Sequence, residues 1–356
     1  MHLTSDFAPK EYNQYIGRKY AVILGGLLIL FILVIISISV GAVAIPPLDV
    51  VRTLTGTTIS DKYNTIIWNI RLPQVLAAVC AGIGLSVAGA AMQSILRNPL
   101  GSPFTLGISS AGAFGAAFSI IVLGAGTVSS TGTDIVTVTN PWMTTATAFA
   151  FCLLATGVIL LLSTMREASP ESMILAGVAL GSLFSAGTML LQYFADDTKL
   201  ASVVFWSFGD VGRATWGSLT LIAVIVAASV IYFILNRWNY NAIDAGDETA
   251  KALGVEVERV RLTGMVAASL VTAVTVSFLG VIGFVGLICP HMMRRLIGND
   301  ERFLIPASCV AGAVLLLASD TAARLIISPR VLPVAILTTF LGVPIFLWMV
   351  FRRTGR

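Results

Sequence analysis

The dominant feature of this sequence is a series of long apolar segments, which short polar patches separate between Tyr20 and Phe351. Most of the segments are close to the length of about 20 residues that a helix needs to cross a bilayer. Only 11% of the residues are charged, whereas a typical soluble domain has about 25%. The chain cannot bury so much apolar surface in one soluble core, so it is predicted to be an all-α membrane protein.

The apolar segments predict a bundle of about ten transmembrane helices in a single domain, residues 1–356. The first segment is too long for the apolar region of a signal peptide, so it is predicted to be the first span. A polar outer loop at residues 124–140 has no predicted role. The predicted spans are Tyr20–Ala44, Leu72–Ser94, Phe104–Leu123, Trp142–Ser163, Ser172–Phe194, Trp216–Leu235, Val260–Phe278, Ile282–Met293, Leu304–Ser319 and Pro333–Phe351.

The basic residues predict the orientation of the chain. An even number of spans places both termini on one side, and the cytoplasmic segments of membrane proteins are enriched in Lys and Arg. With the termini inside, 15 of the 22 Lys and Arg residues lie in cytoplasmic segments and seven lie outside. We therefore predict a multi-pass protein of the cell (cytoplasmic) membrane with both termini in the cytoplasm.

No arrangement of residues is typical of catalysis, metal binding or nucleotide binding. The cysteines Cys80, Cys152, Cys289 and Cys309 lie inside apolar segments without a CxxC pair, which favours packing over a zinc site. No G-x-x-x-x-G-K-[ST] motif occurs, so a P-loop for ATP is not expected. The basic residues are scattered at span ends rather than clustered. We expect no enzymatic activity, no metal site, no bound cofactor and no nucleic acid partner.

Ionisable residues are rare within the predicted spans. Asp320 lies at the outer end of the ninth predicted span, and His291 lies at the inner end of the eighth. Carriers coupled to protons or sodium usually have acids or histidines at mid-membrane depth, where their cost selects for function. This chain offers no such relay of ionisable residues. A secondary transporter or channel without an ATPase partner is therefore kept only as the alternative hypothesis. A third hypothesis is a membrane-embedded enzyme, but the sequence contains no arrangement of catalytic residues that would support it.

A long polar loop at residues 236–258 separates the sixth and seventh predicted spans. Residues 247–253 are predicted to form a short helix, since Asp247 and Glu248 stand at its start and Lys251 near its end, as the helix dipole favours. Gly254 is suited to the C-terminal cap of such a helix. A helix of two turns is barely stable alone, so docking on a partner would explain it.

Several long motifs resemble the FecCD, or vitamin B12-permease, family of ABC importer permeases for iron chelates, haem and cobalamin. The stretch IRLPQVLAAVCAGIGLSVAGAAMQSILRNPLGSPFTLGISSAGAFGA, residues 70–116, is similar to the most recognisable block of that family. Residues 173–184, 280–326 and 332–350 resemble its later spans, and DAGDETAKALGVEVERVR, residues 244–261, resembles its coupling loop. The resemblance covers nearly the whole chain, in order.

The resemblance implies the type II ABC importer fold, with ten spans in each subunit and a homodimer that encloses the pathway. It implies two ABC ATPase subunits, which use ATP and magnesium, and a substrate-binding protein on the outer side of the bilayer. The implied function is import of a metal chelate (ferric siderophore, haem or cobalamin) by ATP-driven alternating access. The motifs do not discriminate among these chelates.

The resemblance also implies roles for single residues on the cytoplasmic side. The inner gate of the family matches Ser169, Pro170 and Glu171, which by themselves are also a well-formed helix start. In the coupling helix, packing at Ala250 and Leu253 is expected to matter more than any single charge. The implied coupling residues are Asp247, Glu248, Ala250, Lys251, Leu253 and Gly254.

On the outer side, Arg71 and Arg324 match positions that pair with glutamates of the binding protein in the family. Rim charges of this kind would tune encounter more than affinity. The alternative is that both arginines anchor helix ends. Where a cobalamin permease has a second arginine three residues after the first, this chain has Gln74, so docking is expected to be weaker or differently arranged.

Overall fold

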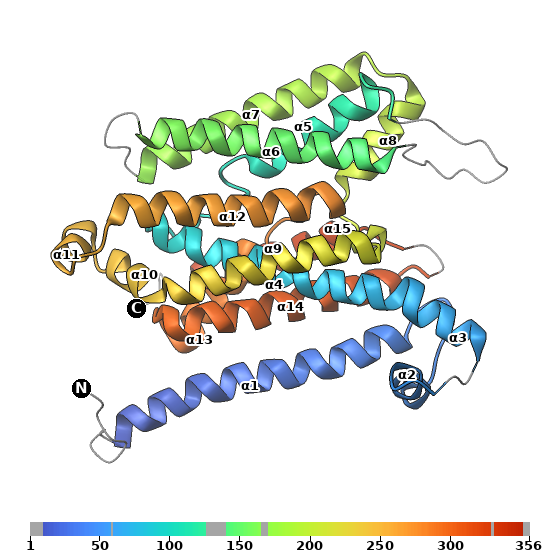
Figure 1. The fold of residues 1–356 in the computed structure, drawn as a ribbon, viewed down its shortest axis with the longest axis horizontal. Helices are drawn as coiled ribbons and strands as arrows, with labels where there is room; N and C mark the ends of the chain where they lie inside the picture. Colours follow the sequence, from blue (N-terminus) through green and yellow to red (C-terminus); the bar gives the residue numbers. More distant parts are fainter. Residues whose placement is uncertain (1–9, 58–59, 126–139, 165–169, 329–330, 352–356) are drawn as a thin grey trace.

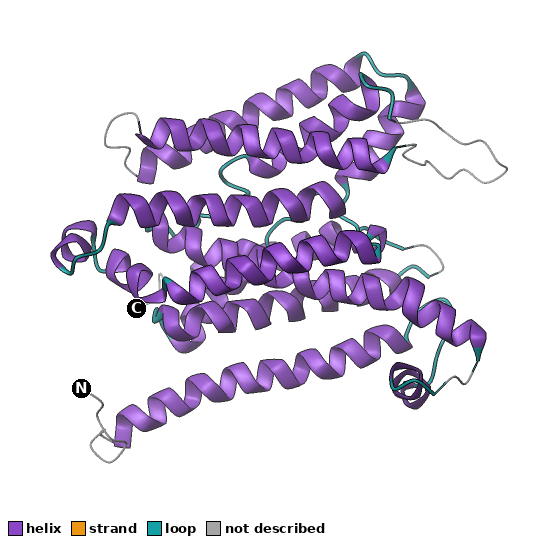
Figure 2. Cartoon of the chain, viewed as in Figure 1, coloured by secondary structure: helices purple, strands orange, loops and turns teal. Residues whose placement is uncertain are grey.

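The computed structural model describes residues 10–57, 60–125, 140–164, 170–328 and 331–351. These residues form helices joined by short connections, and they contain no strand apart from one isolated bridge between Phe208 and Val281 (Figure 2). The predicted all-α class is therefore confirmed.

Each of the ten predicted spans coincides with a helix of at least 13 residues. Seven helices of the described chain are long and apolar enough to cross a membrane. The helices that match the predicted spans are α1 (Lys10–Ser39), α4 (Leu72–Ile95), α5 (Ile108–Ile121), α6 (Pro141–Thr164), α7 (Pro170–Tyr193), α9 (Trp216–Leu235), α12 (Val257–Leu279), α13 (Val285–Ile297), α14 (Glu301–Leu325) and α15 (Val334–Phe351).

Short helices connect the long ones at the two ends of the molecule (Figure 1). We call one end the α11 end, because it carries α10 (Arg237–Asp244) and α11 (Asp247–Ala252). The other is called the opposite end, and its short helices are α2 (Pro47–Leu54), α3 (Asp61–Ile66), the π-helix η2 (Ile67–Arg71), α8 (Asp197–Ser207) and the 3-10 helix η3 (Val211–Arg213).

Helix α4 lies at the centre of the bundle and packs against α9, α12, α13 and α14. Its glycines let backbones touch: a Cβ atom at Gly82 would collide with the backbone of Gly312 in α14, and one at Gly89 with the backbone of Gly286 in α13. Lipid provides no hydrophobic force between helices, so close approach of this kind holds the bundle together. Helix α1 packs on one side of this core, and α5, α6 and α7 form a layer on the other (Figure 1).

Two of the predicted spans are half-length helices that begin inside the bundle. Gly107, which precedes α5, contacts Gly177 in α7. Gly177 lies seven residues after the start of α7, which is about 10 Å along the helix from that end. Helix α13 begins where Gly286 meets Leu85 in α4. The non-helical backbone before each helix is packed among protein, as a bilayer requires. The predicted spans Phe104–Leu123 and Ile282–Met293 were therefore misplaced at their ends.

The six tryptophans lie near the two ends of the long helices. Helix α9 runs from the opposite end to the α11 end (Figure 1). It has 20 residues and is therefore about 30 Å long, close to the thickness of the hydrocarbon core of a bilayer. Tryptophan side chains concentrate at membrane interfaces, so the arrangement fits a bilayer between the two ends. Trp68, Trp142, Trp206 and Trp216 lie near the opposite end, and Trp238 and Trp348 near the α11 end.

Candidate functional site

The predicted coupling helix is present as α11, and its C-terminal cap is the one expected from Gly254. The Gly254 amide donates to the Lys251 carbonyl at 3.0 Å, and the Val255 amide donates to the Ala250 carbonyl at 2.9 Å. This pair of bonds is a Schellman motif, and Gly254 has the positive φ of 84° that the motif requires. The helix therefore has a defined end although it has only six residues.

The apolar residues of α11 have opposite environments. Ala250 is fully buried in the core that includes Val257 of α12, whereas Leu253 is 70% exposed. Glu248 and Lys251 are also exposed. Leu253 is therefore accessible to a partner, while Ala250 packs inside the subunit. The importance of packing at both positions stays a prediction.

Asp247 ties α11 to the rest of the bundle. Its carboxylate accepts hydrogen bonds from the Arg261 guanidinium at 3.1 and 3.2 Å, and Arg97 lies 3.9 Å away. Arg261 belongs to α12 and also donates to the carbonyl of Ile95, the last residue of α4. Charge-assisted bonds of this geometry are strong, so α11 is joined to the ends of two core helices.

A partly buried ionic network includes Asp244, the last residue of α10. The Arg294 guanidinium is 2.8 Å from Glu301 and 3.5 Å from Asp244, and the Ser94 hydroxyl donates to Glu301 at 2.8 Å. Burial raises the pKa of the Asp244 carboxyl, which Arg294 opposes. The network joins α4, α10, α13 and α14, so the base of the coupling loop is held by groups that are costly to separate.

At the opposite end, the side chains of Arg71 and Arg324 form hydrogen bonds within the subunit. The Arg71 guanidinium donates to carbonyls of residues 38, 39 and 43, and Arg324 donates to those of residues 37 and 40. These carbonyls belong to the last turn of α1, whose carbonyls lack partners within the helix, and to the loop that follows it. Both side chains are mostly buried. The contacts are those of the anchoring alternative, and the docking role stays a prediction.

Gln74 belongs to the same cluster. Its side-chain amide donates to Asp320 at 2.9 Å, and Asp320 in turn lies 3.0 Å from Arg324. Gln74 and Asp320 are both buried. The glutamine at this position therefore has a partner within the subunit, in a network that braces Arg324.

The predicted gate residues fall partly within the described chain. Pro170 is the first residue of α7 and is buried, and Glu171 stands in the first turn with an exposed side chain. The predicted helix start is therefore confirmed at Pro170, whereas Ser169 lies outside the described residues. The assignment of a gate stays a prediction.

A groove with a mostly apolar lining and several hydroxyl groups lies between α5 and α7 on the surface of the helix layer. It contains two adjoining hollows of about 500 and 260 Å³, which share Phe104, Ser110, Ser185 and Met189. Hydroxyl and amide side chains from Thr105, Ser182, Thr188 and Gln192 also line it, and none of the lining residues is charged. Several of these hydroxyls donate to nearby backbone carbonyls, as Ser182 does to Val178 and Thr188 to Phe184, both at 2.9 Å. The groove is therefore an uncharged hollow whose polar groups are largely satisfied within the chain.

Sequence reasoning missed this groove. In the sequence, small residues recur every four positions at Gly177, Gly181 and Ser185 and at Gly107, Ala111 and Gly115, a pattern typical of helix packing in membranes. They do pack, since Gly107 touches Gly177 and Gly181, but the hydroxyls beside the stripe are left in the open hollow. The signal that could have found it is hydroxyl residues next to small residues on one face.

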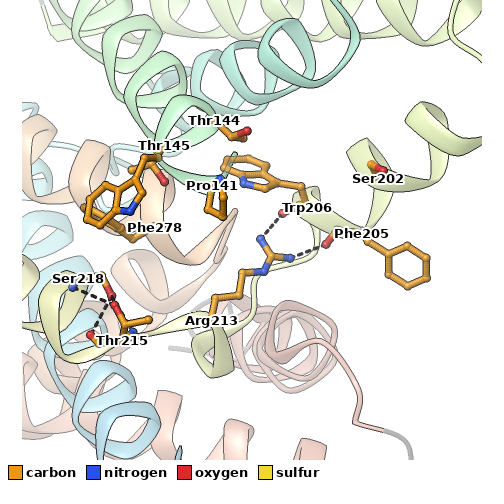
Figure 3. A pocket seen from close by; sticks show the side chains of 11 residues that line it. Pro141, Thr144, Thr145, Ser202, Phe205, Trp206, Arg213, Thr215, Ser218 and Phe278 are labelled. Carbon is orange, nitrogen blue, oxygen red and sulfur yellow. Dashed lines mark hydrogen bonds between the residues drawn. The ribbon is translucent and has the colours of Figure 1, made fainter. Parts of the chain in front are cut away.

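A second hollow of about 460 Å³ lies at the opposite end, between α6, α8, α9 and α12 (Figure 3). Its walls include the aromatic rings of Trp142, Trp206 and Phe278. Arg213 borders it, but its guanidinium donates to the carbonyls of Phe205 at 2.6 Å and Trp206 at 3.1 Å. The arginine therefore holds the end of α8 rather than offering a free charge to a ligand.

No group of three His, Cys, Asp or Glu side chains that could hold a metal is found among the residues that the structure describes. The four cysteines occur as free thiols in the bundle.

The chain matches one family along most of its length. The model of the FecCD transport family matches residues 29–352. A protein of Methanocaldococcus jannaschii that is named as an ABC transporter permease is 54% identical over 350 residues, 98% of this chain and 99% of that protein. The hemin transport system permease protein of Yersinia pestis is 35% identical over 331 residues, 93% of this chain and 95% of that protein.

The fold agrees with these relatives. A solved structure described as an inward-facing conformation of a metal-chelate type ABC transporter has a TM-score of 0.80 and 30% identity, and the match covers 93% of this chain and 99% of that one. The relatives and the apolar helices identify a multi-pass membrane protein. The chain therefore belongs to the FecCD transport family of ABC transporter permeases.

Proposed function

We propose that the chain is the transmembrane subunit of a binding-protein-dependent ABC importer that moves a metal chelate into the cell. In this proposal two copies form a homodimer, two ABC ATPases bind at the α11 end, and a substrate-binding protein docks at the opposite end. ATP and magnesium are used by the ATPases. The observation that carries the proposal is the form of α11, which presents an exposed leucine on a helix anchored to the core.

The construction of α11 suits the transmission of force. Leu253 offers an apolar surface to a partner, while Asp247 bonds to Arg261 of α12 and Arg261 bonds to the end of α4. A push on α11 would therefore move two core helices as one body. Alternating access needs such rigid coupling between the ATPase and the spans.

The groove between α5 and α7 supports a homodimer with a central pathway. The groove is an uncharged hollow on the outer surface of the helix layer, and a second copy of the chain facing α7 would enclose it between the two subunits. A lining of neutral polar and small side chains gives a bulky chelate contacts without a deep binding site. Passage requires binding that is weak enough for release.

The inside-positive charge distribution and the position of α11 agree on orientation. The sequence assigns 15 of the 22 basic residues to the inner segments, and the loop that contains α11 is one of these segments. We therefore infer that the α11 end faces the cytoplasm, with both termini on that side. The ferric siderophore, haem and cobalamin all fit the proposal as cargo, since a neutral groove does not select among them.

The alternative is a secondary transporter or channel without an ATPase. Acids do occur in the long helices, but Asp320 pairs with Arg324 at 3.0 Å and Glu301 pairs with Arg294 at 2.8 Å. Carboxylates held in such pairs are poorly suited to a proton relay, which needs groups that change charge during transport.

The test is the substitution Leu253→Asp in the tagged full-length protein. Since Leu253 is 70% exposed, the subunit should keep its melting temperature, while recovery of the ATPase and ATP-dependent uptake should fall at least tenfold. Glu258→Ala, an exposed position in the first turn of α12, serves as the control and should leave both unchanged. Unchanged uptake by Leu253→Asp, with no ATPase recovered from the wild type, would favour the secondary transporter.

A further inference from the structure

A basic pocket of about 510 Å³ lies at the α11 end. Arg97 follows α4 directly, and Arg294 and Arg295 occupy the last turn of α13. Gln93 of α4 and Asp244 of α10 complete the wall that faces these arginines. Three guanidinium groups therefore surround one hollow, and Asp244 is the one carboxylate in its lining.

The positive charge of this pocket is only partly balanced. Arg294 pairs with Glu301 and Asp244, so its charge is used within the subunit. Arg97 reaches Asp247 only at 3.9 Å, and its side chain is 42% exposed. Arg97 therefore keeps accessible donors for an anionic group in the pocket.

Arg97 has a backbone conformation that favours glycine. Its φ is +44°, and it occupies the C′ position of a Schellman motif, in which the Asn98 amide donates to the Gln93 carbonyl at 3.0 Å. Glycine would adopt this conformation without strain. An arginine at this position indicates that its guanidinium has a function that glycine could not provide.

The pocket borders the apolar surface of the bundle at the level of a membrane interface. The Arg295 guanidinium lies 5.6 Å from the ring centre of Trp348 in α15, and tryptophan is a residue of membrane interfaces. Leu296 and Trp348 are both exposed beside it. A molecule with an anionic head and apolar chains would match a basic hollow next to such a surface.

We propose that this pocket binds the phosphate of an anionic phospholipid headgroup from the leaflet at the α11 end. Guanidinium groups bind phosphate oxygens with paired hydrogen bonds, and Arg97 and Arg295 both line the hollow. Basic pockets between spans are a recognised form of lipid site. Binding of the lipid requires only that the chain lies in a membrane, as the permeases of its family do. Its effect on α11, through the contact of Arg97 with Asp247, rests on the proposed function.

The experiment is native mass spectrometry of the full-length protein, delipidated in a neutral detergent and titrated with phosphatidylglycerol or with phosphatidylcholine. The wild type should prefer phosphatidylglycerol. The double variant Arg97→Gln and Arg295→Gln should raise the dissociation constant for phosphatidylglycerol roughly 30-fold, since two interfacial charges are lost. Binding of phosphatidylcholine should not change. Arg259→Gln, whose side chain is 76% exposed outside the pocket, should bind as the wild type does.

Three results would overturn the proposal. The first is equal binding of phosphatidylglycerol by the wild type and the double variant. The second is displacement of the lipid by millimolar inorganic phosphate, which would assign the pocket to a soluble phosphate compound. The third is loss of lipid binding when the ATPase is present, which would assign the pocket to an acidic side chain of that partner. If the double variant does not fold, Arg295→Gln alone should weaken binding roughly fivefold.

Discussion

Ala250 and Leu253 lie three residues apart and have different environments. Ala250 is buried in the core beside α12, and Leu253 is exposed just after the last turn of α11. The first holds α11 to the subunit, and the second is available to a partner. A change at each position therefore has a different consequence.

Ala250→Leu is expected to destabilise the coupling loop itself. Extra methylene groups in a packed site cost about 1–3 kcal/mol, so the variant should melt earlier and α11 should be cut sooner by a protease. Ala252→Leu is the matched control, since Ala252 is exposed on the same helix, and its effect should stay within about 0.5 kcal/mol. Equal melting of the two variants would mean that Ala250 is not buried as described.

At the level of elements, glycine contacts set the distance between the central helices. Gly82 of α4 and Gly312 of α14 meet backbone to backbone, so even one methyl group has no space there. Gly157 in α6 has the opposite surroundings, with open space where a Cβ atom would lie. The same substitution should therefore be harmful at one position and harmless at the other.

Gly82→Ala is expected to force α4 and α14 apart and to abolish most of the folded, monodisperse protein in size-exclusion chromatography. Gly157→Ala should be tolerated or slightly stabilising, by up to about 1 kcal/mol, because alanine is the better helix former. Normal recovery of Gly82→Ala would show that the α4–α14 contact can relax and does not set the spacing of the bundle.

At the level of the whole molecule, the proposed homodimer needs a face that meets the second copy, and the groove between α5 and α7 is the candidate. Ser182 of α7 is exposed beside the groove, whereas exposed Leu24 of α1 lies in the apolar run 20–36. A hollow leaves its lining without packing partners unless another body fills it. The α7 side is therefore expected to be the dimer face.

In a cysteine-free background, Ser182→Cys should form a covalent dimer with a flexible thiol cross-linker in native membranes. Leu24→Cys, on the lipid-facing side, should stay monomeric under the same conditions. The result is measured by gel electrophoresis. Dimers from Leu24→Cys but not from Ser182→Cys would place the contact between copies on the α1 side and would remove the support that the groove gives to a central pathway.

The sequence alone was enough to predict most helices and the coupling helix. Apolar length predicts spans because a bilayer demands it locally, and Gly254 predicts the end of α11 because its backbone conformation is a property of one residue. The family could be identified from long motifs, and the matching family model confirms it.

Only the tertiary structure decided where α5 and α13 begin, which side of α11 is buried, and what Arg71 and Arg324 hold. Each depends on contacts between segments far apart in the chain: Gly107 against Gly177, Ala250 in a shared core, and the arginines on carbonyls at the end of α1. Apolar pattern and local propensity contain no information on such pairings. They arise when helices pack closely enough for backbones to touch.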